Sequence, residues 1–221
     1  MKKGLRACAV GMALIAGLSA SAEDFTPRNP MTLWYDVPST ATGVKNVWME
    51  YSLPIGNGQL GGSLFGGLNK DEIQFNEKTL WTGKPSDMQG FGGGYGQYKN
   101  FGSIFVEDLS GVFLPGKDGE VKDYVRSLDL QEGIGRVHCT SAEYMTAYDR
   151  TYFVSNPDKV MVARYQASGK KKLHLLFSFA PGKDINASPV VYATDAGSLP
   201  YANFHGQLET VAYQATMRVV P

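Results

Sequence analysis

Apolar and polar residues alternate with a period of two in several parts of the chain, and this restricts its fold more than any other feature. The clearest case is residues 210–220, in which every second residue from Val211 to Val219 is apolar. In residues 173–179, leucine and phenylalanine alternate with His174, Leu176 and Ser178. Successive side chains of a strand point to opposite faces of its sheet, so both segments are predicted to be half-buried antiparallel strands.

Weaker strand signals, separated by turn signals, run along the rest of the chain. Strands are predicted at residues 33–35, 47–52, 73–76, 124–130, 148–154 and 159–166. A turn is predicted at residues 156–158, and surface loops at residues 90–96 and 114–120. No stretch keeps a helical period for more than about two turns. Many short strands without alternating helices predict an all-β fold, a sandwich of stacked antiparallel sheets.

The first 22 residues carry the pattern of a secretory signal peptide. Three basic residues precede an uncharged run over residues 7–18, which ends in the small residues Ala20, Ser21 and Ala22. This run is shorter than the roughly 20 apolar residues that cross a bilayer. We therefore expect cleavage after Ala22, a mature domain over residues 23–221, no membrane association after cleavage, and export to the periplasm or the extracellular space.

Charge and cysteine content exclude several classes of protein. Lys+Arg and Asp+Glu number 21 each, which excludes a strongly basic nucleic-acid binder and an acidic disordered chain. Cleavage after Ala22 would leave Cys139 as the single cysteine, so no intramolecular disulfide is expected. His138, His174 and His205 are widely spaced and form no ligand pattern, so we expect no metal and no cofactor.

One glycine-rich stretch imitates a nucleotide-binding motif. Gly56, Gly58 and Gly61 have the G-x-G-x-x-G spacing of dinucleotide-binding loops. That motif works only where the last glycine opens a helix, and further glycines at positions 62, 66 and 67 disfavour a helix here. We predict a β-bulge or tight backbone packing instead of a nucleotide site.

Neighbouring carboxylates occur twice, at Asp71 and Glu72 and at Glu107 and Asp108. Glycoside hydrolysis uses two carboxyl groups, or one carboxylic acid and a positioned water, on opposite sides of a sugar. Neighbouring side chains of a strand diverge, however, so neither pair is predicted to be a catalytic dyad. A turn or a solvated sheet edge is the prediction for both.

A longer motif resembles a known enzyme family. Residues 73–85 read Ile-Gln-Phe-Asn-Glu-Lys-Thr-Leu-Trp-Thr-Gly-Lys-Pro. With residues 33–35, 53–61 and 65–67, this run resembles the start of the glycoside hydrolase family 95 enzymes, the α-L-fucosidases and related α-L-galactosidases. The resemblance continues in order through residues 124–130, 148–153, 155–160 and 213–219, and it covers essentially all of the mature chain.

This resemblance implies a fold and a partner. The N-terminal domain of that family is a large antiparallel β-sandwich, or super-sandwich, followed by an (α/α)6 barrel that carries the residues for inverting hydrolysis. We therefore expect that the catalytic barrel is missing from this chain, that no catalytic residue lies on it, and that no cofactor is needed. The implied partners are a helical barrel domain, in cis or in trans, and through it a fucosylated or related glycan.

Three candidate residues follow from the motif: Asn76, Glu77 and Trp81. The resemblance implies that they face the junction between domains. One role is structural, a polar turn in which Trp81 packs against the barrel. The other is contact with the sugar, through the ring of Trp81 and the polar side chains of Asn76 and Glu77. Two alternatives stay open for the chain: a free-standing carbohydrate-binding module that uses Trp34, Trp48 or Trp81, and a nonfunctional fragment of a split gene.

Overall fold

The computed structural model describes residues 25–39, 45–83, 96–113, 121–194 and 199–221. The predicted signal peptide, the predicted loop at residues 114–120 and most of that at residues 90–96 lie outside these ranges. The described elements, in chain order, are β1 (Thr32–Tyr35), α1 (Val47–Tyr51), β2 (Leu53–Gly56), β3 (Leu60–Leu64), β4 (Lys70–Glu77), β5 (Gly102–Asp108), β6 (Val121–Asp129), β7 (Ile134–Ser141), β8 (Thr146–Val154), β9 (Met161–Gly169), β10 (Leu175–Pro181), β11 (Val191–Ala193), β12 (Tyr201–Gln207) and β13 (Ala212–Arg218).

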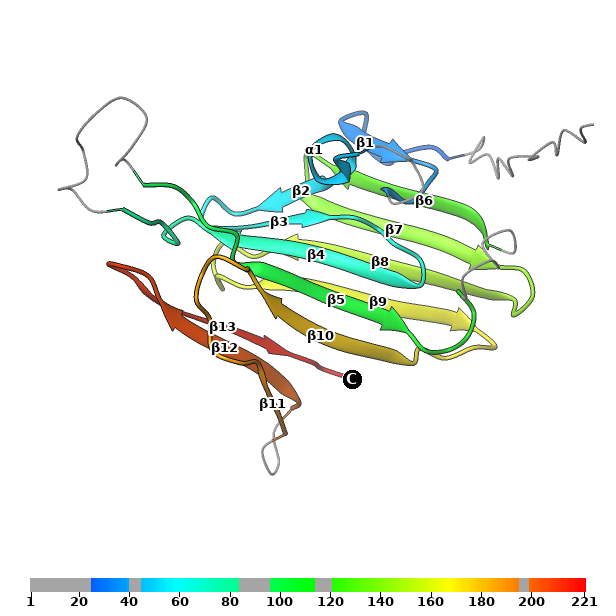
Figure 1. Cartoon of the computed structure of the whole chain (residues 1–221). Helices are drawn as coiled ribbons and strands as arrows, with labels where there is room; N and C mark the ends of the chain where they lie inside the picture. The colour runs from blue at the N-terminus through cyan, green and yellow to red at the C-terminus, as the bar shows by residue number, and fades with distance from the viewer. Residues whose placement is uncertain (1–24, 40–44, 84–95, 114–120, 195–198) are drawn as a thin grey trace, which may run out of the picture.

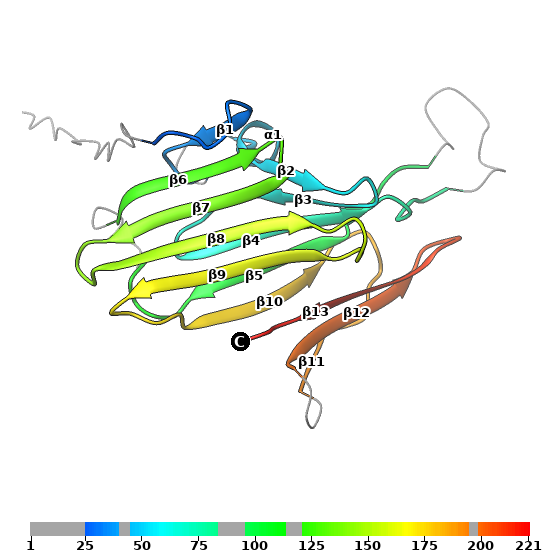
Figure 2. The same ribbon diagram turned by 180° about the vertical axis from the view of Figure 1, so that it is seen from behind.

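These strands form three antiparallel sheets (Figure 1). The first sheet has the order β1-β6-β7-β8-β9, the second β10-β5-β4-β3-β2, and the small sheet β11-β12-β13. The first two sheets stack face to face, and the small sheet lies beyond β10 (Figures 1 and 2). The predicted all-β sandwich is therefore confirmed. None of the helices in the described ranges is long and apolar enough to cross a membrane.

Most predicted strands are found where the alternation placed them. The two clearest correspond to β10 and β13, and the weaker ones to β1, β4, β6, β8 and β9. The strand predicted at residues 47–52 is wrong, because residues 47–51 form the short helix α1. The Asn46 side chain caps this helix by accepting a hydrogen bond from the Met49 backbone N–H (3.2 Å). No residue of α1 is buried, so the alternating apolar residues of this segment do not pack against a sheet.

The glycine-rich stretch forms the β2–β3 hairpin. Its turn has Gly58 at φ +84°, and the Asn57 side chain accepts hydrogen bonds from the backbone N–H groups of Gln59 (2.9 Å) and Leu60 (2.8 Å). Strand β3 follows Gly58 where a dinucleotide loop requires a helix, which supports rejecting that motif. The β2–β3 pairing has a regular register without a bulge, and tight packing appears at Gly66, which has φ +69° and accepts a hydrogen bond from the Tyr124 hydroxyl (2.6 Å).

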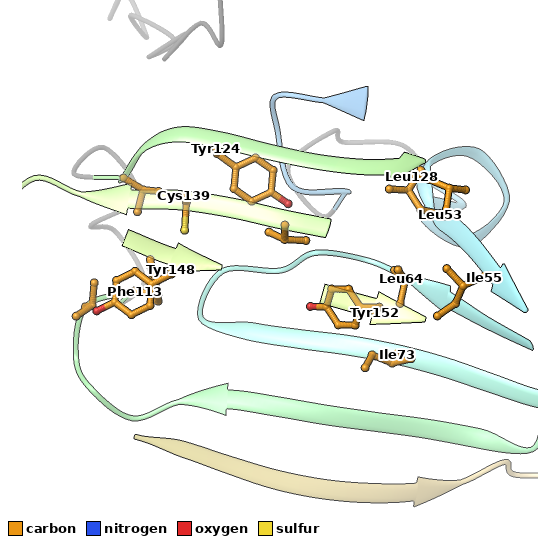
Figure 3. Packing of buried hydrophobic residues seen from close by; sticks show 13 residues of the cluster. Leu53, Ile55, Leu64, Ile73, Phe113, Tyr124, Leu128, Cys139, Tyr148 and Tyr152 are labelled. Atoms are coloured by element: carbon orange, nitrogen blue, oxygen red, sulfur yellow. The ribbon is translucent and has the colours of Figure 1, made fainter. Parts of the chain in front are cut away.

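Two apolar clusters hold the sheets together. The first lies between the two five-stranded sheets, where side chains such as Ile73 from β4 and Tyr152 from β8 meet (Figure 3). The second joins the second sheet to the small sheet. Its buried members are Phe75, Leu80, Phe101, Phe179, Ile185, Ala202, Phe204 and Tyr213. The C-terminal strands are therefore attached to the sandwich mainly through aromatic rings.

Candidate functional site

A buried polar cluster connects the two large sheets. Asp71 on β4 is 1% exposed and Arg150 on β8 is 8% exposed, and their closest charged atoms, Asp71 Oδ2 and Arg150 Nη1, are 3.5 Å apart. The same Asp71 oxygen accepts hydrogen bonds from the hydroxyls of Tyr152 (2.5 Å) and Tyr165 (2.9 Å). Arg150 also donates to the backbone carbonyls of Gly67 (2.5 Å) and Leu68 (3.0 Å).

This cluster corrects the prediction for Asp71, which lies inside the sandwich and not in a turn or at a solvated edge. Burial, the largest single influence, lowers the pKa of the Arg150 guanidinium, but the charge of Asp71 together with Tyr152, Tyr165 and Cys139 raises that pKa overall. Burial, with the Asp71 charge second, raises the pKa of the Tyr152 and Tyr165 hydroxyls well above 10. Asp71, Arg150 and Tyr152 are buried and Tyr165 is half-buried, and their contacts connect β4 to β8 and β9.

The side chains of the second carboxylate pair, Glu107 and Asp108, diverge as predicted. Like Asp71, they do not lie in a turn. Both residues belong to β5, where Glu107 forms an exposed ion pair with Lys70 (2.7 Å). Asp108 is 8% exposed and accepts hydrogen bonds from the backbone N–H (3.1 Å) and the hydroxyl (2.7 Å) of Ser110. One carboxylate is therefore solvated and the other supports the loop after β5.

The motif residues lie at the end of β4 and in the connection that follows it. The Asn76 side chain accepts a hydrogen bond from the Glu77 backbone N–H (2.9 Å). One oxygen of Glu77 accepts from both the backbone N–H (2.7 Å) and the hydroxyl of Thr79. The other Glu77 oxygen, Oε1, is buried without a hydrogen-bond partner among the described residues. Asn76 and Glu77 thus shape the backbone that leads to Trp81.

Trp81 forms part of an exposed aromatic pair. Its side chain is 37% exposed, and its ring meets that of Tyr98 edge to face, with centroids 4.6 Å apart and planes at 90°. Tyr98 is 57% exposed, and an isolated antiparallel bridge joins the two residues. The preceding residue, Leu80, is 1% exposed and belongs to the second apolar cluster. A buried leucine therefore anchors a segment that holds two aromatic rings at the surface.

Tyr98 was not identified from the sequence. It lies 17 positions after Trp81, beyond a glycine-rich stretch that carries no strand pattern. The other tryptophans occur on different elements: Trp34 on β1 is 40% exposed and contacts Phe25 (centroids 5.3 Å apart), and Trp48 on α1 is 52% exposed. Trp81 therefore shares its surface with Tyr98, which sequence spacing alone could not indicate.

Histidines and carboxylates do not gather into a metal site in the described ranges, where no group of three or more His, Cys, Asp or Glu side chains could hold an ion. His138 and Cys139 point to opposite faces of β7. Cys139 is 1% exposed, whereas His138 Nδ1 lies 2.7 Å from an oxygen of Asp149 at the surface. The expected absence of a cofactor stays a prediction.

Comparison with known proteins identifies the domain. The family model described as "Glycosyl hydrolase family 65, N-terminal domain" matches residues 33–93 and 86–221. Alpha-L-fucosidase 2 of Arabidopsis thaliana is 28% identical over 166 residues, which cover 63% of this chain and 19% of that protein. Probable alpha-fucosidase A of Aspergillus niger is 26% identical over 182 residues, which cover 69% of this chain and 22% of that protein.

This chain therefore spans about a fifth of the length of the curated relatives that it matches. The resemblance to a glycoside hydrolase N-terminal domain is confirmed, while the assignment to family 95 in particular stays a prediction. The match runs from β1 to the end of β13 and so includes all three sheets. The chain belongs to the family of glycosyl hydrolase family 65 N-terminal domains.

Proposed function

We propose that this chain is the N-terminal β-sandwich of an exported glycoside hydrolase of the α-L-fucosidase type, as found in family 95. In this role it supports a separate catalytic (α/α)6 barrel that acts on fucosylated glycans. The observation that carries the proposal is that both curated relatives are α-fucosidases of which the chain matches about a fifth. The activity of the whole protein then lies in polypeptide outside this domain.

The buried acidic residues support this division of labour. Most retaining and inverting glycosidases use two carboxyl groups that flank a sugar in an accessible site. Asp71 is instead enclosed with Arg150, and Asp129 accepts hydrogen bonds from the backbone N–H groups of Glu132 and Gln131 (3.0 Å each). The hydrogen bond from Glu132 is the main reason that the pKa of Asp129 is lowered. These carboxylates stabilise a turn and a sheet interface.

The connection after β4 is the part of the domain that we assign to the junction with the barrel. Glu77 and Asn76 use hydrogen bonds to fix its backbone, and Leu80 anchors it in the core. Trp81 and Tyr98 then offer apolar ring surface to a neighbouring domain. A structural junction needs this combination of a rigid base and an exposed aromatic contact.

An activity assay tests the proposal. The chain, expressed with its own N-terminus, is purified from the exported fraction and incubated with an aryl α-L-fucoside. We expect a mature N-terminus at Glu23 and no turnover above background. Turnover that Glu77→Gln abolishes, with folding retained, would overturn the proposed role, and retention of the uncleaved chain in the cytoplasm would overturn export.

A second candidate function is carbohydrate binding by the domain itself, which the exposed Trp81–Tyr98 pair favours. Aromatic rings bind the C–H faces of sugars. Titration with fucosylated oligosaccharides separates the two functions, with Trp48→Ala as the matched control because Trp48 is also exposed. Saturable binding that Trp81→Ala removes and Trp48→Ala preserves would support a binding module; no binding by the intact domain favours the supporting role.

A further inference from the structure

Strands β9 and β13 are edge strands of the first and the small sheet, and β10 lies between them (Figure 2). In the small sheet, Val219 donates its backbone N–H to Pro200 (3.0 Å), so alternate residues of β13 bond to β12. The residues between them, such as Gln214 and Thr216, direct their backbone N–H and C=O groups away from β12. In the first sheet, Ser155 donates to the Val160 carbonyl (2.9 Å), which by the same alternation leaves Tyr165 of β9 with outward backbone groups.

Aromatic and aliphatic side chains line part of the surface between these strands. Phe177 of β10 packs against the Tyr165 ring of β9, with centroids 6.2 Å apart. Phe177 also lines a groove of about 380 Å³ together with Met217 and Val219 of β13 and Tyr201 of β12. Seen from behind, β10 is visible between β9 and β13 (Figure 2). One aromatic ring thus bridges from the first sheet to the groove beside the small sheet.

The edge of β10 itself is partly closed, in contrast to that of β13. The outward backbone N–H of Phe179 donates to the hydroxyl of Tyr192 (3.0 Å), which extends from β11. Along β13, no such side chain caps the outward N–H groups among the described residues, and the exposed face carries Gln214, Thr216 and Arg218. This strand also lacks proline, one of the devices that protect sheet edges.

We propose that the free edge of β13, beside the groove that Phe177 lines, is a docking site for one additional β-strand, supplied by another polypeptide segment with apolar side chains at alternate positions. The strand pairs with the free edge of β13 and directs its apolar side chains toward Phe177. A strand fits better than a flat apolar partner, because the site offers backbone donors and acceptors beside these apolar side chains. About four fifths of each relative lies outside the matched part, and such polypeptide can supply the strand.

A peptide with the sequence of residues 211–219 serves as the probe, since it has the required alternation. We expect saturable binding of the fluorescein-labelled peptide to the intact chain, measured by fluorescence anisotropy. A peptide of equal composition with the alternation scrambled should bind at least about tenfold more weakly, since its apolar side chains cannot all face the groove. Equal binding of both peptides, or no saturable binding of the first, would overturn the proposal.

The variant Thr216→Pro tests the edge directly. It removes an outward N–H without breaking a hydrogen bond to β12, and should weaken peptide binding by about tenfold, whereas Thr216→Ala keeps the N–H and the binding. Circular dichroism and thermal unfolding verify that both variants fold. Peptide binding unchanged by Thr216→Pro in a folded variant would exclude pairing at this edge.

Hydrogen exchange gives an independent measurement on the unmodified chain. The bound peptide should slow exchange of the outward amides of Gln214, Thr216 and Arg218, while those of Tyr213 and Ala215, already bonded to β12, change little. Protection of the same amides by a fucosylated oligosaccharide, or by dimerisation that Thr216→Pro abolishes, would assign the site to another occupant and overturn the proposal. None of these measurements depends on fucosidase activity.

Discussion

The two large sheets and the small sheet are joined to the rest of the molecule in different ways. Between the large sheets, an apolar cluster surrounds the ion pair of Asp71 and Arg150, which connects β4 to β8. The small sheet uses mainly aromatic contacts, such as Phe204 against Phe179 (centroids 4.8 Å apart), and its Tyr213 hydroxyl donates to the Ile185 carbonyl. The sandwich thus has both apolar and ionic attachment, while the small sheet depends on a few rings.

This difference predicts two levels of stability in one domain. Burying a charged pair disfavours arrangements of the two sheets that separate its partners, because either partner left alone is strongly unfavourable. The aromatic contacts of the small sheet leave no buried charge when they separate. In addition, β13 is an edge strand with a neighbour on one side only. We therefore expect the small sheet to open at a lower free energy than the sandwich.

The largest effect is expected from Asp71→Ala. It leaves Arg150 buried without a counter-charge and removes the acceptor for the hydroxyls of Tyr152 and Tyr165. The free energy of unfolding should fall by about 3–5 kcal/mol, measured by urea denaturation. The matched control is Glu107→Gln, which breaks the exposed pair with Lys70 and should cost less than about 1 kcal/mol. Equal losses in the two variants would contradict the role given to the buried pair.

A somewhat smaller and more local effect is expected from Phe204→Ala. Phe204 is fully buried and contacts Phe101 and Phe179, so its loss should destabilise the attachment of the small sheet by about 3 kcal/mol. Hydrogen exchange should show lost protection in β12 and β13 while β7 and β8 keep theirs. Tyr192→Phe, which removes only one hydrogen bond to β10, is the milder control. Protection lost equally in all sheets would mean that the domain opens as one unit.

The smallest effect is a pH dependence that belongs to the sandwich. Burial raises the pKa of Tyr148 to about 12, whereas an exposed tyrosine has a pKa of about 10. Between these values the unfolded chain releases a proton that the folded chain retains, so stability is unaffected below pH 10 and falls as pH rises toward 12. Urea unfolding at several alkaline pH values should show a shallower fall in Tyr148→Phe. An identical slope in both proteins would contradict this assignment.

The sequence predicted the fold class well, because alternation reports directly on half-buried strands. It missed β2, β3, β5, β7, β11 and β12. In β7, for example, the buried positions are Gly135, Val137, Cys139 and Ser141, and such small and polar residues produce little apolar contrast. It also predicted a strand where α1 forms, because a local cap determines the structure of a segment that buries nothing. Period-two reasoning therefore succeeds where a buried face is made of large apolar residues.

The candidate site was predicted only in part. A local motif pointed to Asn76, Glu77 and Trp81, but their neighbour Tyr98 is brought close by the path of the chain between β4 and β5. The burial of Asp71 could have been inferred from its position two residues before Ile73, on the same face of the strand. Its partner Arg150 could not, because the pairing depends on how β8 lies against β4 in the folded sandwich.

The long-range hydrogen bonds of Arg150 also restrict the order in which the domain can fold. Its guanidinium satisfies carbonyls of Gly67 and Leu68, which precede it by 83 and 82 residues in the chain. Such distant contacts form slowly, and during synthesis they must wait until β8 has emerged from the ribosome. A chain that stays unfolded for this long would suit the export that we propose, since translocation precedes folding there.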